Sequence, residues 1–230
     1  MKFLWRTMAE RLYDLSQLLG PKQLNVLIMD AHLKEAQAWW QDKLQQPCAG
    51  IEVRTLHDLD QLPEKQYDLI IWTLPPIKLL DPKMAPAIWL KLRLCCKGFM
   101  LFVTPGPKTT VALNRIFSTQ MAGLARDLHD IGDDLVRAGW QRPMLQEQTL
   151  SIAYNHYETL FEDWRVLGDD DHHPLWIHAP HITTPVAKVN DPIDFDLTLG
   201  LVYNGQDHTI QQQLDDGAIA IPLAALRKKS

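Results

Sequence analysis

The densest group of potential metal ligands in the 230-residue chain lies at residues 169–181. Three consecutive aspartates are followed directly by two histidines, and His178 and His181 come soon after. Neutral imidazoles together with carboxylates suit zinc or nickel. The spacing matches no closed structural zinc site, however, and no cysteine lies nearby. We therefore expect a solvated polar loop here and no metal site.

Two further pairs of residues carry groups that could do chemistry. His129 and Asp130 could form an acid–base pair, but no serine or cysteine in a G-x-S-x-G nucleophile elbow accompanies them. Cys95 and Cys96, beside Lys97, could include a thiol of lowered pKa, but they end a segment that is typical of a buried helix. We expect a structural role for the first pair and core packing for the second.

Apolar runs alternate with amphipathic segments along the chain. Almost wholly apolar runs are typical of strands buried on both faces, and they cover residues 24–29, 67–72 and 99–104. Three further strands are predicted within 51–55, 144–154 and 194–203. Apolar residues at helical spacing predict helices over 1–20, 31–46, 84–96 and 127–138.

Strands and helices in alternation predict an α/β fold, with a mostly parallel sheet and helices on both faces. Ligands of such sheets bind at the carboxyl ends of the strands. We expect a single domain over 1–230, with the helix at 1–20 lying on it. The irregular stretch 168–192 is long for a loop in a compact domain, which is typical of a functional loop or a lid.

Three segments resemble one family, the malonyl-acyl-carrier-protein O-methyltransferases of biotin synthesis. The most specific is D-L-H-D-I-G-D-D-L-V-R-A-G-W at 127–140, which is similar to the family's D-M-H-D-[IL]-G-D-A-L-V-R-A-G-F. Y-D-L-I-I at 67–71 matches the F-D-L-V of its fourth strand, and L-F-V-T-P-G-P-K-T at 101–109 resembles its F-x-T-x-G-P-x-T. The resemblance covers 67–168 well and implies a class I methyltransferase fold that binds S-adenosylmethionine.

The run at 127–140 also has a purely structural interpretation. Asp127 stands at the start of the predicted helix and can cap it, and Gly139 is suited to end it. Leu135 and Val136 are expected to be buried. The run therefore supports the resemblance without indicating a catalytic role.

The first strand is where the chain departs from the family. Active members carry V-L-D-L-G-C-G-T-G there, and this chain reads V-L-I-M-D-A-H-L-K over 26–34. Asp30, His32 and Lys34 thus stand where the resemblance implies glycines. Glycine is needed because the backbone turns with positive φ and approaches the cofactor without a Cβ in the way. Other residues at such angles cost on the order of 1 kcal/mol each.

A second departure is the short interval between the strands at 24–29 and 67–72. The resemblance places strand two with its ribose-binding acid, a helix and strand three in this interval. Here there is room for one strand and the connection 57–66. Glu52 could serve as the ribose-binding acid, but it lies inside the predicted strand rather than at its end. The sheet is therefore expected to be reduced in this region, with half of the adenosine pocket missing.

Five positions are the site residues that the resemblance implies. If S-adenosylmethionine is bound, its contacts are Asp30, Thr73 and Leu74. Tyr154 and Arg165 match family positions close to the substrate lid, so we expect them to face a substrate.

The composition bounds the class of protein. Apolar residues make up 46% and charged residues 22%, as in soluble globular proteins. A net charge of −5 argues against a nucleic-acid or anionic-membrane binder. No apolar run reaches the ~18 residues of a spanning helix. Charged residues interrupt the segment 1–20, which is therefore not expected to be a signal peptide. The three cysteines form no disulfide framework. We therefore expect a cytoplasmic location.

Two functions remain open. The chain could be an active S-adenosylmethionine-dependent carboxyl O-methyltransferase that acts on a malonyl thioester of acyl carrier protein, mainly by positioning the carboxylate in line with the methyl group. It could instead be a non-catalytic relative without a cofactor, retained as a binding or regulatory subunit beside an active methyltransferase or an acyl carrier protein. The lost glycines and the shortened interval favour the second function.

Overall fold

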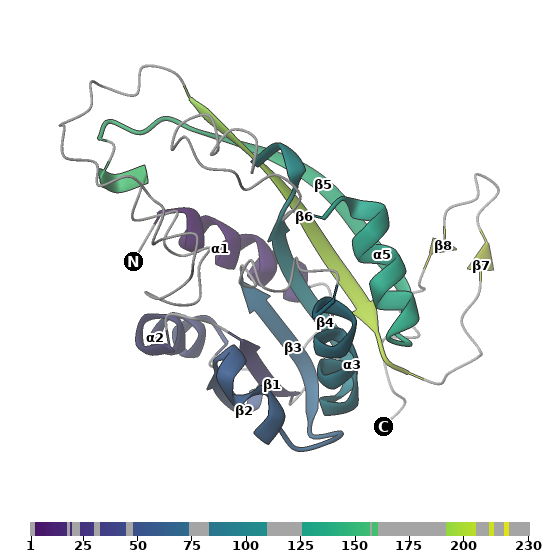
Figure 1. Ribbon diagram of the computed structural model, residues 1–230. Coiled ribbons are helices and arrows are strands. Elements are labelled where there is room, and N and C mark those ends of the chain that lie inside the picture. Colours follow the sequence, from purple (N-terminus) through teal and green to yellow (C-terminus); the bar gives the residue numbers. More distant parts are fainter. Residues whose placement is uncertain are drawn as a thin grey trace.

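A six-stranded sheet organises the part of the chain that the structure, a computed structural model, describes (Figure 1). The described residues are 3–17, 19, 24–29, 33–44, 48–73, 83–109, 126–156, 158–160, 192–205, 212–213 and 219–220. The strand order is β2-β1-β3-β4-β6-β5. The strands are β1 (Leu24–Met29), β2 (Cys48–Arg54), β3 (Tyr67–Thr73), β4 (Cys96–Pro105), β5 (Gln141–Ile152) and β6 (Ile193–Tyr203).

The sheet is mixed. β2, β1, β3 and β4 are parallel to one another, whereas β6 is antiparallel to both β4 and β5. β5 and β6 are the longest strands and run side by side across the molecule (Figure 1). β7 (Gln212–Gln213) and β8 (Ile219–Ala220) form a separate two-stranded sheet.

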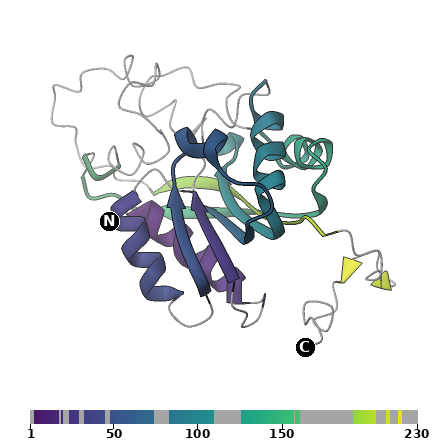
Figure 2. The same ribbon diagram turned by 90° about the horizontal axis from the view of Figure 1, so that it is seen from below.

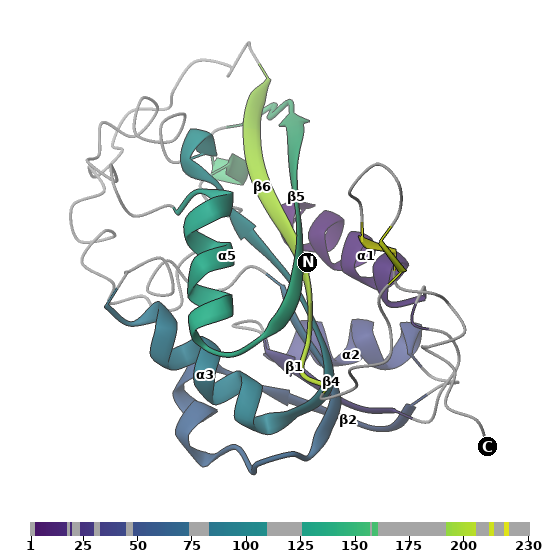
Figure 3. The ribbon, with the colours of Figure 1, turned by 90° about the vertical axis from the view of Figure 1, so that its right-hand side faces the viewer.

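Helices cover both faces of the six-stranded sheet. α1 (Phe3–Gln17) and α2 (Leu33–Lys43) lie on one face, and α3 (Ala85–Cys95) and α5 (Leu128–Arg137) lie on the other, as Figures 2 and 3 show; Figure 2 presents the sheet from below. Among the described helices, none is long and apolar enough to cross a membrane.

The two faces explain why the central strands are apolar throughout. In β1, Val26 and Ile28 pack with the α1 and α2 side chains, whereas Leu27 and Met29 pack with those of α3. Since alternate residues of a strand point to opposite faces, a strand covered on both sides has no polar face. The α/β fold class predicted from these runs is confirmed.

The shortened interval is also confirmed. Residues 48–73 are described without a gap, and they pass from β2 through the short 3-10 helix η1 (Leu56–Gln61) directly into β3. β2 is consequently the edge of the described sheet. β2 begins at Cys48, three residues before its predicted start, because Leu24 pairs with Cys48 and Asn25 with Gly50.

The ends of α5 follow the sequence prediction, and one of its buried residues does not. Asp127 caps the helix, since its Oδ1 accepts a hydrogen bond of 2.8 Å from the Asp130 amide. Gly139 ends it with a φ of +86°. The prediction for Val136 is wrong, because this side chain is 58% exposed. The buried face has the spacing i, i+3, i+4 and consists of Ile131, Asp134 and Leu135.

Candidate functional site

The carboxyl ends of the four parallel strands meet at one edge of the sheet, which is where ligands of α/β sheets bind. These strands end at Met29, Arg54, Thr73 and Pro105. β6 runs in the opposite direction, so its first residues lie at the same edge, with Leu197 opposite Pro105. We call this the carboxyl edge.

The end of β2 does not offer an acid with a free carboxylate. Glu52 accepts hydrogen bonds from the Tyr67 hydroxyl at 2.5 Å and from Arg54 Nε at 2.8 Å. Burial and the neighbouring Glu52 carboxylate raise the pKa of the Tyr67 phenol, so the phenol stays protonated and donates to Glu52. The last residue of β2 is the cationic Arg54. The amide of the following residue, Thr55, donates a hydrogen bond to the Asp58 carboxylate as part of the N-terminal cap of η1. Both acids are therefore engaged by the protein itself.

Thr73 is the described member of the three predicted cofactor contacts. Its side chain is 2% exposed, and among the described residues its hydroxyl has no hydrogen-bond partner. Its register with Val103 places it on the α1 and α2 face of the sheet. Asp30 and Leu74 lie outside the described residues.

The turn after β4 is built around Asp196 of β6, a residue that the sequence analysis did not single out. The Gly106 amide donates to the Asp196 carbonyl oxygen at 2.7 Å, and the Thr109 hydroxyl donates to the same oxygen at 2.6 Å. A Cβ atom on Gly106 would lie 2.7 Å from Asp196 Oδ2. Thr104, Gly106 and Thr109 all belong to the segment that resembles F-x-T-x-G-P-x-T.

Thr104, Asp196 and Thr198 form a group of buried polar side chains on one face of the sheet. Thr104 lies directly opposite Thr198, and Asp196 is two residues before Thr198, so the three point to the same side. The strand F-D-L-T-L alternates apolar and polar residues. That alternation was the sequence signal that could have pointed to these buried polar residues. It fits an edge strand with a solvated face equally well, whereas β6 is an internal strand.

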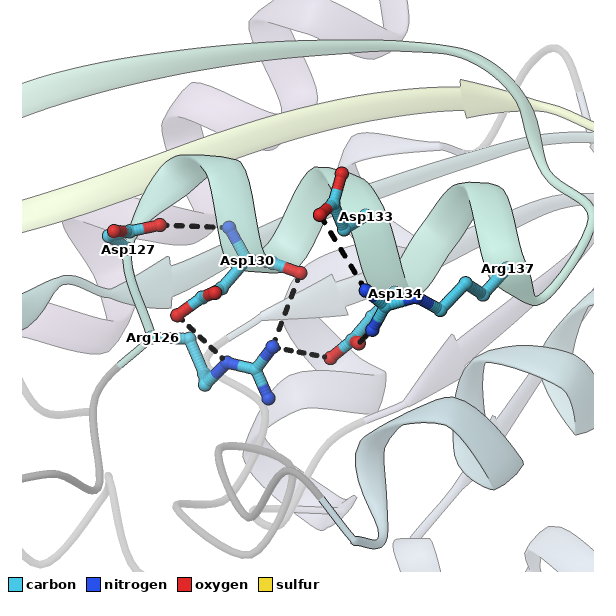
Figure 4. A network of polar contacts seen from close by, with 6 residues as sticks. All are labelled: Arg126, Asp127, Asp130, Asp133, Asp134 and Arg137. Atoms are coloured by element: carbon cyan, nitrogen blue, oxygen red, sulfur yellow. Dashed lines mark hydrogen bonds and ion pairs between the residues drawn. The ribbon is translucent and has the colours of Figure 1, made fainter.

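A network of ion pairs lies at α5 (Figure 4). Arg126 Nη2 is 3.0 Å from Asp134 Oδ2, and Arg126 Nε is 3.4 Å from Asp130 Oδ2. Asp134 stands where the resembled family has alanine. Burial raises the pKa of its carboxyl, and the Arg126 and Arg137 guanidinium groups only partly oppose this. Four aspartates surround two arginines here, so the network is no anion site and its role is structural.

Tyr154 lies just beyond the end of β5 at the carboxyl edge, but it is buried, with its ring 6.3 Å from that of Phe195 in an edge-on arrangement. Arg165 lies outside the described residues. The predicted role of both in facing a substrate therefore stays a prediction.

The other chemical groups do not assemble. His129 and Asp130 are exposed, and the Asp130 carboxylate pairs with Arg126. Cys95 and Cys96 are buried in the core, so the core packing expected for them is confirmed. Burial raises the pKa of both thiols, that of Cys96 to about 12, which excludes the alternative of a thiol of lowered pKa. The described ranges hold no group of three metal-ligating side chains, and 169–181 lies outside them.

Comparison with known proteins shows a sequence likeness over part of the chain. No family model matches the chain. The chain is similar to proteins named malonyl-[acyl-carrier protein] O-methyltransferase, at 29% identity over 140 residues for that of Gallionella capsiferriformans and 26% over 133 residues for that of Laribacter hongkongensis. These matches cover 59% and 56% of this chain and 47% and 45% of the relatives, so it spans about half their length.

Solved structures share the fold. The YcgJ protein of Bacillus subtilis matches with a TM-score of 0.52 at 11% identity, over 86% of this chain and 100% of its own. Phosphoethanolamine N-methyltransferase 2 of Haemonchus contortus, solved with S-adenosylhomocysteine, matches with a TM-score of 0.50 at 7% identity, over 86% of this chain and 53% of its own. The chain therefore has the fold of class I S-adenosylmethionine-dependent methyltransferases, and its sequence resembles that of malonyl-[acyl-carrier protein] O-methyltransferases.

Proposed function

We propose that this chain is a binding or regulatory relative of the malonyl-[acyl-carrier protein] O-methyltransferases that does not bind S-adenosylmethionine and does not transfer methyl groups. The observation that carries the proposal is the end of β2, where the adenosine ribose would need an acceptor for its hydroxyl protons. Arg54 stands there, and a guanidinium group has donors only. Glu52, two residues earlier, already accepts from Tyr67 and Arg54.

The turn after β1 supports the same conclusion from sequence. Asp30, His32 and Lys34 replace the three glycines of the family's pattern. Each change adds a Cβ where the cofactor needs bare backbone. The two departures concern different parts of one ligand, the methionine end and the ribose. The residues present therefore do not fit S-adenosylmethionine, and no step of chemistry is assigned to it here.

The partner that we propose is an active methyltransferase. A chain that keeps the fold but not the cofactor contacts can still present the surface of its relatives to another protein. Acyl carrier protein is the alternative partner, but it is acidic and this chain carries a net charge of −5, which disfavours their association. The three cysteines are free thiols, which supports a reducing compartment such as the cytoplasm.

One observation favours the rival function, an active carboxyl O-methyltransferase. Thr73 is at the end of β3, and its buried hydroxyl has no partner among the described residues. Buried polar groups normally have partners, so a bound ligand could supply one. The resemblance to named methyltransferases adds to this case.

Thermal unfolding with S-adenosylmethionine or S-adenosylhomocysteine tests the proposal. A ligand at 100 times its dissociation constant stabilises the folded state by ~2.7 kcal/mol, which raises the melting temperature by several degrees. We expect no saturable rise at up to millimolar ligand, and no heat of binding by titration calorimetry.

A relative that retains the glycine turn serves as the positive control for the same assay. Thr73→Val is the matched variant of this chain, because it keeps the shape of the side chain and removes the hydroxyl. A saturable rise at micromolar ligand would refute the proposal, and its loss in Thr73→Val would assign the binding to the end of β3.

A further inference from the structure

Asp196 is a buried carboxylate without a cationic partner in the described part of the chain. It is 3% exposed, and none of the ion pairs between described residues involves it. Burying a charge is costly unless a charge of opposite sign or several hydrogen bonds offset the loss of water. A carboxylate can accept about four hydrogen bonds, and an ammonium group would supply both donors and the opposite charge.

Thr104 provides a second, independent sign of a ligand. Thr104 is 1% exposed, and its hydroxyl has no hydrogen-bond partner among the described residues. Thr104 is opposite Thr198 in the antiparallel pair of β4 and β6, which puts it on the same face as Asp196. An acceptor and a free hydroxyl thus lie together at the carboxyl edge, where sheets of this class bind ligands.

The turn that carries these groups is held in place. The Gly106 amide and the Thr109 hydroxyl both bind the Asp196 carbonyl oxygen. Gly106 has no side chain to cover the carboxylate, because a Cβ there would lie 2.7 Å from Asp196 Oδ2 and 3.1 Å from its Cγ. These two hydrogen bonds fix the backbone at Asp196 before a ligand arrives, which lowers the entropic cost of binding.

We propose that Asp196 and Thr104 form a binding site for a small molecule that carries a protonated amine next to a hydroxyl group. The ammonium group pairs with the Asp196 carboxylate, and the hydroxyl group bonds to Thr104. This inference does not rest on the proposed function, because it concerns β4 and β6 rather than the ends of β1 and β2.

Three probes of matched size test the charge requirement. Ethanolamine carries the ammonium and the hydroxyl group, ethylene glycol replaces the ammonium with a neutral hydroxyl, and glycolate replaces it with a carboxylate. Ligands with so few atoms bind weakly, so binding is measured by NMR line shifts and thermal unfolding over millimolar concentrations at constant ionic strength. We expect a saturable response to ethanolamine and none to the other two.

Variants of the full chain assign the response to this site. Asp196→Asn keeps the shape and removes the charge. Gly106→Ala keeps both binding groups but displaces the carboxylate, because the added Cβ would lie 2.7 Å from Asp196 Oδ2. Both variants should lower the ethanolamine affinity at least tenfold. Thr104→Val should weaken it, and Thr104→Ser, which restores the hydroxyl, should recover it.

The stability of the ligand-free protein separates binding from a structural role. If the charge serves a ligand, ligand-free Asp196→Asn melts at or above the temperature of the wild type, since an uncompensated buried charge is removed. A marked fall in its melting temperature, an equal ethanolamine response in wild type and Asp196→Asn, or no response of the wild type would each overturn the proposal.

Discussion

At the scale of single residues, Asp134 sets burial against ion pairing. Its pKa is raised above the ordinary 3.8 because burial outweighs the attraction of Arg126 and Arg137. The folded state then binds the proton more tightly than the unfolded state, so the contribution of this carboxyl to stability is largest below pH 3.8 and falls as the pH rises through the native pKa. Relative to Asp134→Asn, wild type should lose free energy of unfolding over that range, as urea unfolding at several pH values measures.

Asp133 offers the matched control on the same helix. It is exposed, and its carboxylate is 3.7 Å from Arg137 Nη2. The difference between wild type and Asp133→Asn should change little with pH, since exposed pairs contribute little. If wild type instead gains stability relative to Asp134→Asn as the pH rises, pairing with Arg126 outweighs burial, and our interpretation of Asp134 is wrong.

Individual residues were the least predictable from sequence. Asp127 and Gly139 were predictable because capping and a left-handed turn depend on residues close in sequence. Asp196 was not, because its burial depends on the pairing of β6 with β4, about ninety residues earlier. Val136 was predicted to be buried because its side chain is apolar. The helical repeat instead puts Asp134 on the buried face of α5 and leaves Val136 exposed.

At the scale of elements, two glycines of the α5 region should respond in opposite directions to the same substitution. Gly139 has a positive φ, and its amide donates to the Val136 carbonyl oxygen at the end of the helix, so Gly139→Ala should destabilise the protein by about 1 kcal/mol or more. Gly132 lies within the helix, where an added Cβ meets only Leu145 Cδ1 at 3.4 Å. Gly132→Ala should stabilise it by ~0.5 kcal/mol.

Chemical denaturation of both variants measures the two effects with one method. A loss of stability for Gly132→Ala would mean that α5 cannot take up the added atom against β5. An unchanged stability for Gly139→Ala would mean that the turn relaxes to another ending.

The elements themselves were largely predictable. The predicted ends of β1 and β3 agree with the observed ends to within one residue, and so does the predicted end of β4, whose start was predicted three residues late. These strands were predictable because an apolar run bounded by turn residues is a local signal. The predicted β2 was too short at its start. Cys48 to Gly50 join the sheet through pairing with β1 and carry no alternating pattern of their own.

At the scale of the whole molecule, no strand lies beyond β2 in the described sheet, so β2 is an exposed edge that could pair with another chain. Neutralising the charges on this edge tests whether they prevent such pairing. Glu52→Gln/Arg54→Gln removes an ion pair from this edge at constant net charge and keeps an acceptor for Tyr67. Exposed strand edges rely on charge to avoid pairing with other chains. The variant should form oligomers at lower concentration than the wild type, as light scattering measures.

Arg6→Gln/Glu10→Gln is the control, because it removes an exposed ion pair from α1 instead. It should behave as the wild type does. Equal association of both variants would show that loss of charge in general, and not the edge, drives assembly.

β2 is seven residues long and pairs with β1 on one side only, so the backbone amide and carbonyl groups on its outer flank face no neighbouring strand in the described sheet. A sheet that stops one strand early thereby acquires a template on which an extended peptide can add itself. The short interval between β2 and β3 thus leaves an open strand edge to which another protein chain can add by backbone pairing, and Arg54 stands at the end of that edge.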